Sequence, residues 1–415
     1  MLRMDAVIFG GGAAGLWLLD RITRDGGHAV LLESAALGTG QTIAAQGIIH
    51  GGLKYTLQGL LTKSARHIRG MPSVWRDALL GRATPNLTQT RLRSDSCYLW
   101  QTEDLSSHAG MLGARLGLQI KPEMLDPDER PEVLAHVPGT VAKLGEQVIC
   151  PESFLEDLFA QYHDRILQID AEQGLEFETR SPGEVTAIHL TASSGRSLSF
   201  APRQVIFTAG RGNSALRARV GLDAGVAQLR PLHMVLVRGD LPELNGHCVD
   251  GATTRVTITS DIDSQGRRVW QIGGQISEDH VGQDAQTLTQ WAQRELIAVL
   301  PSVSFQHVEW STYQVDRAEG ITSDGKRPET VQVLCAGNVT TGWPTKLALA
   351  PVLALEIASR VQPSDHRRTF DAAAIADWPR PPIATLPWND LNRHWWSLPQ
   401  PHGRTPEQPS IRRAA

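Results

Sequence analysis

The chain has 415 residues, of which 41% are hydrophobic and 20% are charged, and its formal net charge is −4. This composition provides for a sizeable core and suggests two domains, and the charge gives no electrostatic case for binding nucleic acid. The four cysteines are scattered without a CxxC pair, so we expect no metal site and a reducing, cytoplasmic location.

A dinucleotide-binding pattern begins the chain. An apolar strand, residues 6–9, leads into a glycine-rich turn, a helix over residues 16–23 and a second apolar strand over residues 29–32. Gly10 permits the tight turn, Gly12 lets the backbone approach a pyrophosphate, and Gly15 lets the helix pack close to the strand. The order of strand, turn and helix predicts a nucleotide site.

Two further features of this unit point to a bound dinucleotide. The first helical residues, Ala13 and Ala14, present free N–H groups and a partial positive charge to the pyrophosphate. Glu33 ends the second strand, where a carboxylate can bond ribose hydroxyls. The pattern alone does not distinguish NAD from FAD.

We expect neither an export signal nor a membrane-spanning segment in this sequence. The apolar run nearest the N-terminus is the strand before the glycine turn, so we expect no signal peptide. No stretch approaches the ~20 apolar residues that span a bilayer. Peripheral contact with the inner face of a membrane is the alternative to a purely cytoplasmic location.

A segment after Glu33 resembles a known family. Residues 38–47 are small, polar and flexible, and residues 48–55 read Ile-Ile-His-Gly-Gly-Leu-Lys-Tyr. Together they resemble the FAD-dependent D-amino-acid oxidase superfamily, and residues 48–55 are most similar to the branch with glycerol-3-phosphate dehydrogenases and L-2-hydroxyglutarate oxidases. The resemblance implies FAD as the cofactor and assigns flavin-loop contacts to Thr42, Gln46 and Gly47.

The resemblance continues along the chain to residue 360. Residues 204–214 are similar to the family's central strand and turn, residues 333–338 to its last flavin-domain strand, and residues 340–346 to the segment before a helix that points at the flavin pyrimidine edge. A helix dipole there stabilises the reduced flavin. The implied cofactor residues are Val185, whose backbone would contact adenine, and Ala209, Gly210, Gly337, Gly342, Trp343, Thr345 and Lys346.

We therefore expect an α/β fold in which a Rossmann-like FAD-binding domain is interleaved with an antiparallel-sheet substrate domain. The FAD domain would comprise residues 1–75, 148–220 and 325–362, and the substrate domain residues 76–147 and 221–324. Apolar spacing predicts helices over residues 151–162, 285–300 and 347–360. Strands are predicted over residues 185–190, 234–237, 253–259 and 268–273, with a hairpin turn at 261–266.

The tail, residues 363–415, is rich in proline and tryptophan. Prolines exclude long helices, and the tryptophans are too apolar for a disordered linker. We expect a strap on the protein's own surface, with a docking segment for a partner subunit or a membrane as the alternative. Residues 404–415 are expected to fray.

The catalytic residues follow from the chemistry of a flavin, which takes a hydride at N5 while a proton leaves the substrate. His50 is the first candidate base, with hydrogen bonding to the flavin as its alternative, and His233 is the second. Arg317, Lys54 and Lys346 are candidate anchors for a substrate anion. The resemblance suggests Arg317, although its segment, residues 310–320, lacks the family's usual Arg-Pro pair and Asp316 could pair with Arg317 instead. Tyr313 would cap the pocket.

The expected function is an FAD-dependent oxidoreductase, a dehydrogenase or oxidase, that acts on a small anionic substrate, either a 2-hydroxy acid or a polyol phosphate. One alternative is an amine or amino-acid oxidase on the same fold, and another is a flavoprotein subunit that needs a partner. The sequence has no second glycine motif behind a strand, so electrons would pass to oxygen, a quinone or another protein rather than to NAD(P).

Overall fold

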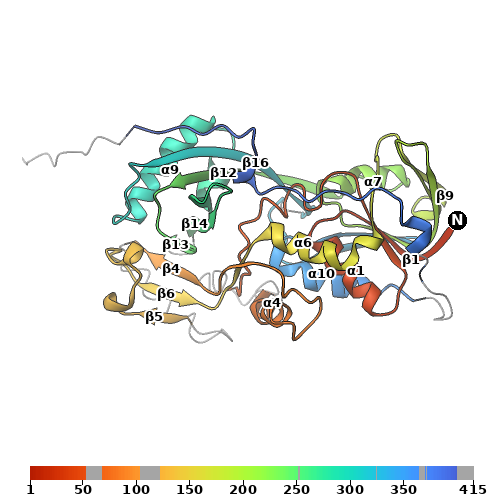
Figure 1. The fold of residues 1–415 in the computed structure, drawn as a ribbon, viewed down its shortest axis with the longest axis horizontal. Helices are drawn as coiled ribbons and strands as arrows, with labels where there is room; N and C mark the ends of the chain where they lie inside the picture. The colour runs from red at the N-terminus through yellow and green to blue at the C-terminus, as the bar shows by residue number, and fades with distance from the viewer. Residues whose placement is uncertain are drawn as a thin grey trace, which may run out of the picture.

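The computed structural model describes residues 1–52, 68–102, 122–250, 253–323, 325–363, 370 and 372–399. Two eight-stranded sheets form its framework, and they lie toward opposite ends of an elongated molecule (Figure 1). Segments from distant parts of the chain meet in each sheet, so the chain crosses between the two halves several times. Mixed parallel and antiparallel pairing confirms the expected α/β class.

The first sheet has a parallel centre. Its order is β17-β18-β11-β1-β2-β8, in which β17 alone runs antiparallel to its neighbour, and β10 and β9 extend it from β11. Val7 lies between Val205 and Val30 in the register of the central strands. The strands are β1 (Leu2–Phe9), β2 (Ala29–Glu33), β8 (Ile166–Gln168), β9 (Leu175–Ser181), β10 (Glu184–Thr191), β11 (Ser197–Phe207), β17 (Gln332–Ala336) and β18 (Val339–Trp343).

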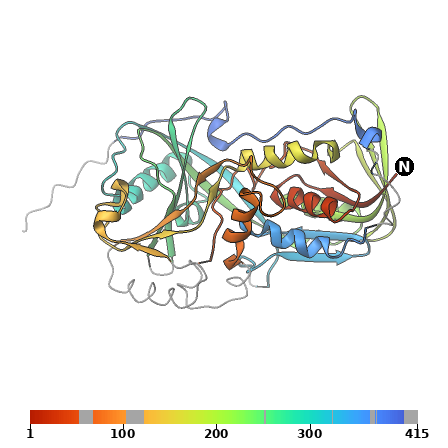
Figure 2. The ribbon, with the colours of Figure 1, turned by 60° about the horizontal axis from the view of Figure 1, so that its bottom comes forward.

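Helices cover one face of this sheet. In Figure 2, α1 (Ala13–Arg24), α6 (Pro151–Tyr162) and α10 (Ala350–Ala358) lie side by side, with α4 (Met71–Leu79) next to them. Trp17, Trp75 and Phe154 meet in the core between them, with ring centroids 4.6 to 6.3 Å apart. In the described part of the chain, no helix is long and apolar enough to cross a membrane.

The other face is covered by the β9–β10 ribbon and the first half of β11. Phe9 from β1 packs against Phe177 and Phe207, each with ring centroids 5.5 Å away. A helix, α7 (Asn213–Arg219), follows β11. Because both faces are covered, the central strands are apolar over residues 6–9, 29–32 and 205–207, as is usual for a parallel sheet.

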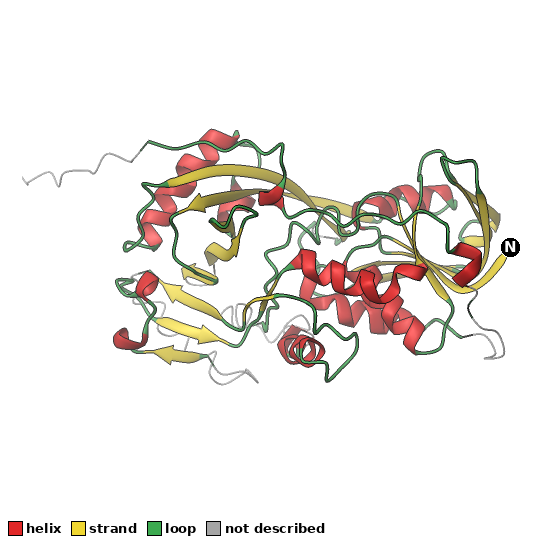
Figure 3. Ribbon diagram, viewed as in Figure 1, coloured by secondary structure: helices red, strands yellow, loops and turns green. Residues whose placement is uncertain are grey.

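The second sheet has the order β16-β12-β15-β14-β13-β4-β6-β5. It is antiparallel except where β13 pairs in parallel with β4, which comes from a much earlier part of the chain. α9 packs against β12 and β16 (Figure 3). The elements are β4 (Cys97–Gln101), β5 (Glu123–Leu125), β6 (Val141–Leu144), β12 (Ala227–Gly239), β13 (Gly246–Asp250), β14 (Thr253–Ile262), β15 (Arg268–Gly273), β16 (Val308–Gly320), α8 (Gln275–Asp279) and α9 (Ala285–Val299); β3 (Leu92–Ser94) and β7 (Val148–Ile149) form a separate small ribbon.

Most of the expected elements are confirmed within a few residues. The helix expected over 151–162 is α6, and the one over 285–300 is α9. The helix expected over 347–360 instead starts as a single 3₁₀ turn, Leu347–Leu349, and becomes α10 at Ala350. Pro351 lies in the first turn of α10, where its missing N–H costs nothing.

The described part of the tail, residues 372–399, packs on the chain's own surface as the strap interpretation predicted. Trp378 and Trp388 are each only 3% exposed. At the far end, Trp310 and Trp396 exchange backbone hydrogen bonds of 2.7 and 3.0 Å. The strap therefore runs from the first sheet to the second (Figure 1). The fraying expected at residues 404–415 lies outside the described residues.

Candidate active site

The glycine turn between β1 and α1 leaves no room for side chains. Gly10 has a φ of +104°, and a Cβ there would lie 2.5 Å from Cα of Ala209 at the end of β11. A Cβ on Gly15 would lie 2.0 Å from the carbonyl oxygen of Gly10. The close approach of β1, β11 and α1 thus depends on these glycines, and it places the start of α1 at the carboxyl edge of the sheet.

Side chains from two neighbouring segments complete this turn. The N–H of Ala13 donates to Oγ1 of Thr42 at 3.1 Å, while N-cap Gly12 supplies no side chain. Oε2 of Glu33 accepts from the N–H of Gly11 at 2.7 Å. Glu33 therefore orients the turn as well as ending β2, a role that the ribose assignment did not include.

The loop after β2 is attached to the second sheet. Nε2 of Gln46 donates to the carbonyls of Thr257 and Gln271, at 3.1 and 2.9 Å. The hydroxyl of Tyr313 donates to the carbonyl of Ala44 at 3.0 Å and accepts from Nε2 of Gln271 at 2.6 Å. Burial raises the pKa of Tyr313, so its hydroxyl stays protonated as this donor. Tyr313 thus joins the two halves of the molecule.

The segments expected at the flavin end lie next to this loop. β18 ends at buried Trp343, and Thr345 follows with a φ of +60°, a conformation that is rare for residues other than glycine. Nη2 of Arg327 donates to the carbonyl of Thr345 at 3.1 Å. A Cβ on Gly342 would lie 2.8 Å from Ile357 of α10, so β18 and α10 approach closely there.

The turn before β18 bonds the backbone that the sequence analysis assigned to adenine. Gly337 adopts a φ of +57°, and Asn338 follows it. The side chain of Asn338 bonds both backbone groups of Val185, its N–H at 2.8 Å and its carbonyl at 2.8 Å. The backbone of Val185 is thus already engaged by the protein, which leaves its assigned contact with adenine without support in this structure.

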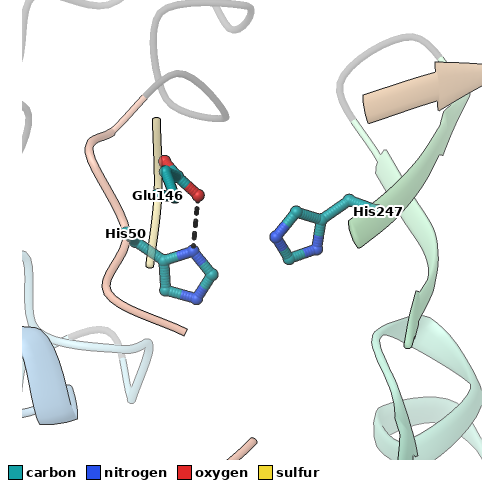
Figure 4. Close-up of side chains that lie close together, drawn as sticks. All are labelled: His50, Glu146 and His247. Carbon is teal, nitrogen blue, oxygen red and sulfur yellow. Dashed lines mark ion pairs between the residues drawn. The ribbon is translucent and has the colours of Figure 1, made fainter. Parts of the chain in front are cut away.

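A cavity between the two halves brings together two histidines and a carboxylate. His50 follows the flavin loop, Glu146 precedes β7, and His247 lies on β13 (Figure 4). Nδ1 of His50 lies 3.5 Å from Oε2 of Glu146, whose Oε1 accepts from the N–H of Gly51 at 2.6 Å. Glu146 is buried, so its charge acts on His50 with little screening.

His247 faces this pair from the second sheet. Its ring centroid lies 5.3 Å from that of His50, and its Nδ1 lies 2.9 Å from Oγ1 of Thr257. Donor atoms of His50, Glu146 and His247 all lie within 4.8 Å of one another. Two imidazoles and a carboxylate are ligand types that suit a transition metal. The absence of CxxC pairs, on which the sequence analysis expected no metal site, says nothing about a cluster of this kind.

Two cationic side chains line the same cavity. These are Arg327, whose guanidinium is held by Thr345 and lies 3.8 Å from buried Glu319, and Lys346, which is 8% exposed. The positive charges of Arg327 and Lys346 disfavour a further cation in the cavity and favour an anion. The cavity therefore combines a histidine–carboxylate pair with two cationic side chains.

The other expected catalytic residues lie outside the lining of this cavity. Nη1 of Arg317 donates to Oε1 of Glu278 at 2.9 Å, and Nε2 of His233 lies 2.9 Å from Oγ1 of Thr312. Burial lowers the pKa of His233, with partial opposition from its hydrogen bond with the backbone of Gln283 and from the charge of Asp284. The structure thus brings together His50 and Lys346 but not His233 and Arg317. Lys54 lies outside the described residues.

Sequence reasoning missed three residues of the cavity, Glu146, His247 and Arg327. Each comes from a different segment, and no local motif marks any of them. One signal was available: Arg327 is followed by Pro328, an Arg-Pro pair outside the segment in which the resemblance sought it. Their roles become visible only when β13, β7 and the segment before β17 meet.

The residues present at the carboxyl edge fit an FAD. The glycine turn brings backbone N–H groups to this edge without side chains, α1 begins there, and Lys346 and the turn at Thr345 lie by the adjoining cavity. A helix N-terminus and glycine backbone suit a pyrophosphate, and a buried cation suits the electron-rich edge of a reduced flavin. The fold and site thus define a flavin-dependent oxidoreductase.

Comparison with known families makes the assignment specific. The sequence model of the FAD dependent oxidoreductase family, DAO, matches residues 5–360. The chain belongs to this family, and FAD is its cofactor.

The chain is similar to the Probable FAD-dependent oxidoreductase PA4991 of Pseudomonas aeruginosa. The two are 36% identical over 392 residues, which cover 93% of this chain and 98% of the relative. The crystal structure of PA4991 has a TM-score of 0.77, with 33% identity over 93% of this chain and 98% of that one. The two proteins thus share their architecture along almost their full lengths.

More distant structures share the fold. L-α-glycerophosphate oxidase from Mycoplasma pneumoniae with FAD bound has a TM-score of 0.60 at 14% identity, covering 90% of this chain and 98% of that chain. Glycine oxidase from Geobacillus kaustophilus also has a TM-score of 0.60, at 15% identity over the same shares. Among these neighbours, one fold therefore serves both a glycerophosphate oxidase and a glycine oxidase.

Proposed function

We propose that the protein oxidises a small anionic substrate that carries a hydroxyl group, a 2-hydroxy acid or a polyol phosphate. The observation that carries this proposal is one cavity that contains His50 paired with Glu146 and also Arg327 and Lys346. A substrate with an anionic group and an oxidisable carbinol needs these two kinds of side chain at its two ends.

The pair formed by His50 and Glu146 supplies the base. FAD, when bound at the carboxyl edge of the first sheet, would supply the hydride acceptor. Nε2 of His50 can take the hydroxyl proton, because the carboxylate of Glu146 beside Nδ1 stabilises the imidazolium that forms. The bond from Gly51 to Glu146 holds this carboxylate in place during the transfer.

The cations orient the substrate. Arg327 and Lys346 would bind its carboxylate or phosphate and so direct the carbinol toward His50. Arg317 serves in this proposal as a supporting charge, because it lies outside the lining of the cavity and Glu278 engages its guanidinium. His233, buried against Thr312, would position β12 and β16 instead of acting as the base.

The experiment is an anaerobic titration of the holoprotein, followed by the flavin absorbance band. The panel comprises 2-hydroxy acids, glycerol and sugar phosphates, amines and amino acids. Bleaching by a hydroxy acid or a polyol phosphate is the expected result, and reoxidation with oxygen, a quinone analogue or an artificial acceptor then identifies the electron acceptor. Bleaching only by amines, with release of ammonia or an amine, would replace the proposal with an amine oxidase. Bleaching by none would favour a partner-dependent subunit.

A further inference from the structure

The cluster of His50, Glu146 and His247 has the spacing of a metal site. One donor atom from each residue lies within 4.8 Å of the other two. A tetrahedral ion with bonds of about 2.0–2.1 Å holds neighbouring ligand atoms roughly 3.3 Å apart. Nδ1 of His50 and Oε2 of Glu146, at 3.5 Å, already match this spacing. Figure 4 shows His247 pointing toward this pair, so a shift of at most about 1.5 Å would complete the set.

The two buried members of the cluster are held through their other polar atoms. Oε1 of Glu146 accepts from the N–H of Gly51 at 2.6 Å, while Oε2 lies toward His50. Nδ1 of His247 lies 2.9 Å from Oγ1 of Thr257. This hydroxyl can accept the Nδ1 proton, and the lone pair of the imidazole then lies on Nε2. Outer partners of this kind orient the ligands of metal sites, and the partly exposed side chain of His50 can adjust to the ion.

The rest of the cavity selects the kind of ion. Leu99, Leu144 and Val249 line it, so charges inside it are weakly screened. Two imidazoles and one carboxylate suit a zinc-class ion, whereas magnesium and calcium prefer oxygen ligands. Arg327 and Lys346 oppose a bare dication, and an anion as the fourth ligand would offset their charges.

We propose that His50, Glu146 and His247 bind a zinc-class divalent ion, which reversibly blocks oxidation of the substrate. A neutral imidazole that ligates through Nδ1 carries its proton on Nε2. Nε2 of His50 could then no longer take the proton of the substrate hydroxyl, and Glu146 would be engaged by the ion. The blocking step rests on the function proposed above, in which His50 is the base, whereas the binding of the ion does not depend on it.

Calorimetric titration of the full-length holoprotein with zinc chloride, after metals are removed with EDTA, measures the binding. One zinc ion should bind per chain, and magnesium at the same concentrations should not bind. His247→Gln should weaken zinc binding at least about tenfold, because one of three ligands is lost. His163→Asn replaces an exposed histidine outside the cluster and is the control, in which zinc affinity should change less than about twofold.

A second variant guards against loss of folding in His247→Gln. Thr257→Val keeps the shape of the side chain but removes the hydroxyl beside Nδ1 of His247. It should weaken zinc binding about 10- to 100-fold with unchanged FAD content, the usual effect of losing an outer partner. If both variants bind zinc as tightly as the wild type, or if the wild type binds no stoichiometric zinc, the inference is overturned.

Anaerobic reduction of the flavin by the substrate found by titration measures the blocking. Saturating zinc should slow the reduction at least about tenfold, and EDTA should restore it. The residual rate of His247→Gln should not respond to the same zinc concentration. Faster reduction with zinc would overturn the blocking role and would remove His50 as the base. Zinc binding that depends on His247, without reduction by any compound of the panel, would support the metal site and overturn the substrate proposal alone.

Discussion

At the scale of single residues, Glu146 and His50 differ in burial, and this difference suits them to different roles in the cavity. Glu146 is buried and bonded to a backbone N–H, whereas the side chain of His50 remains 33% exposed and can reach a substrate. A fixed negative charge beside a reachable imidazole is the arrangement of a general base. His247 stands across the cavity, held by Thr257, where it can contact the same substrate.

The base assignment predicts the outcome of two substitutions. His50→Asn should lower kcat/KM by about 10²- to 10⁴-fold, the usual contribution of a positioned base, with unchanged FAD content. Glu146→Gln should keep the bond from Gly51 but lower kcat by a smaller factor, because the imidazolium loses its counter-charge. Steady-state kinetics with the substrate found by titration measure both. Exposed His163→Asn is the control, and wild-type kinetics in His50→Asn would remove His50 from the mechanism.

His233 gives a prediction on stability and pH. Its pKa is lowered in the folded state by burial, so below about pH 6.5 the unfolded chain binds the proton more readily. The free energy of unfolding should therefore decline as the pH falls from 7 to 5. In His233→Gln, which can still bond Thr312, part of this decline should vanish in urea unfolding series. An identical pH profile in both proteins would contradict the assignment.

At the scale of elements, the unit formed by β1, the glycine turn and α1 requires contact between backbones. β1 and β11 approach at Gly10 and Ala209, and α1 lies on the carbonyl of Gly10 at Gly15. Such contacts place the N-terminus of α1 where a pyrophosphate can bind. The loop after β2 then joins the second sheet through Gln46 and Tyr313.

Gly15→Ala tests this packing. The new Cβ would lie 2.0 Å from the Gly10 carbonyl and 2.9 Å from Oγ1 of Thr208, so the helix must move outward. We expect a loss of about 1–3 kcal/mol in the free energy of unfolding and a lower flavin-to-protein absorbance ratio. Gly282→Ala, where a Cβ meets nothing within 4 Å, should change neither quantity. Equal behaviour of the two variants would argue against a tight turn.

At the scale of the whole molecule, the strap connects the two sheets. Leu386 and Trp388 join the core beneath α1 and α6, and Nη1 of Arg393 donates to the carbonyl of Thr312 at 2.7 Å. Thr312 precedes Tyr313, which holds the flavin loop. The strap thus helps to fix the second sheet over the cofactor edge.

Two leucines within the strap provide a matched pair. Leu386 is 2% exposed and Leu391 is 98% exposed. Leu386→Ala should lower the free energy of unfolding by about 2–5 kcal/mol, because it leaves a cavity in the core. Leu391→Ala should stay within about 0.5 kcal/mol of the wild type. Thermal or denaturant unfolding measures both variants. Equal stabilities of the two variants would mean that the strap is not part of the cooperatively folding unit.

The elements and the cofactor unit could be predicted because their signals are local. Helical spacing at Phe154, Leu155 and Leu158 is set by the 3.6-residue turn, and the glycines near residue 12 answer a local steric need. The parallel pairing of β13 with β4 could not be predicted, because it joins segments about 150 residues apart with no shared pattern. The same holds for the bond between Asn338 and Val185.

The sequence by itself determined the α/β class, the glycine turn, the cofactor and His50 as a candidate, because each depends on neighbouring residues or on a family-wide motif. Only the tertiary structure decided that Glu146 and His247 join His50, that Arg327 and Lys346 share one cavity, and that Arg317 pairs with Glu278. These groupings arise where loops from two sheets meet, and side-chain distances across such a junction depend on long-range packing that no local pattern encodes.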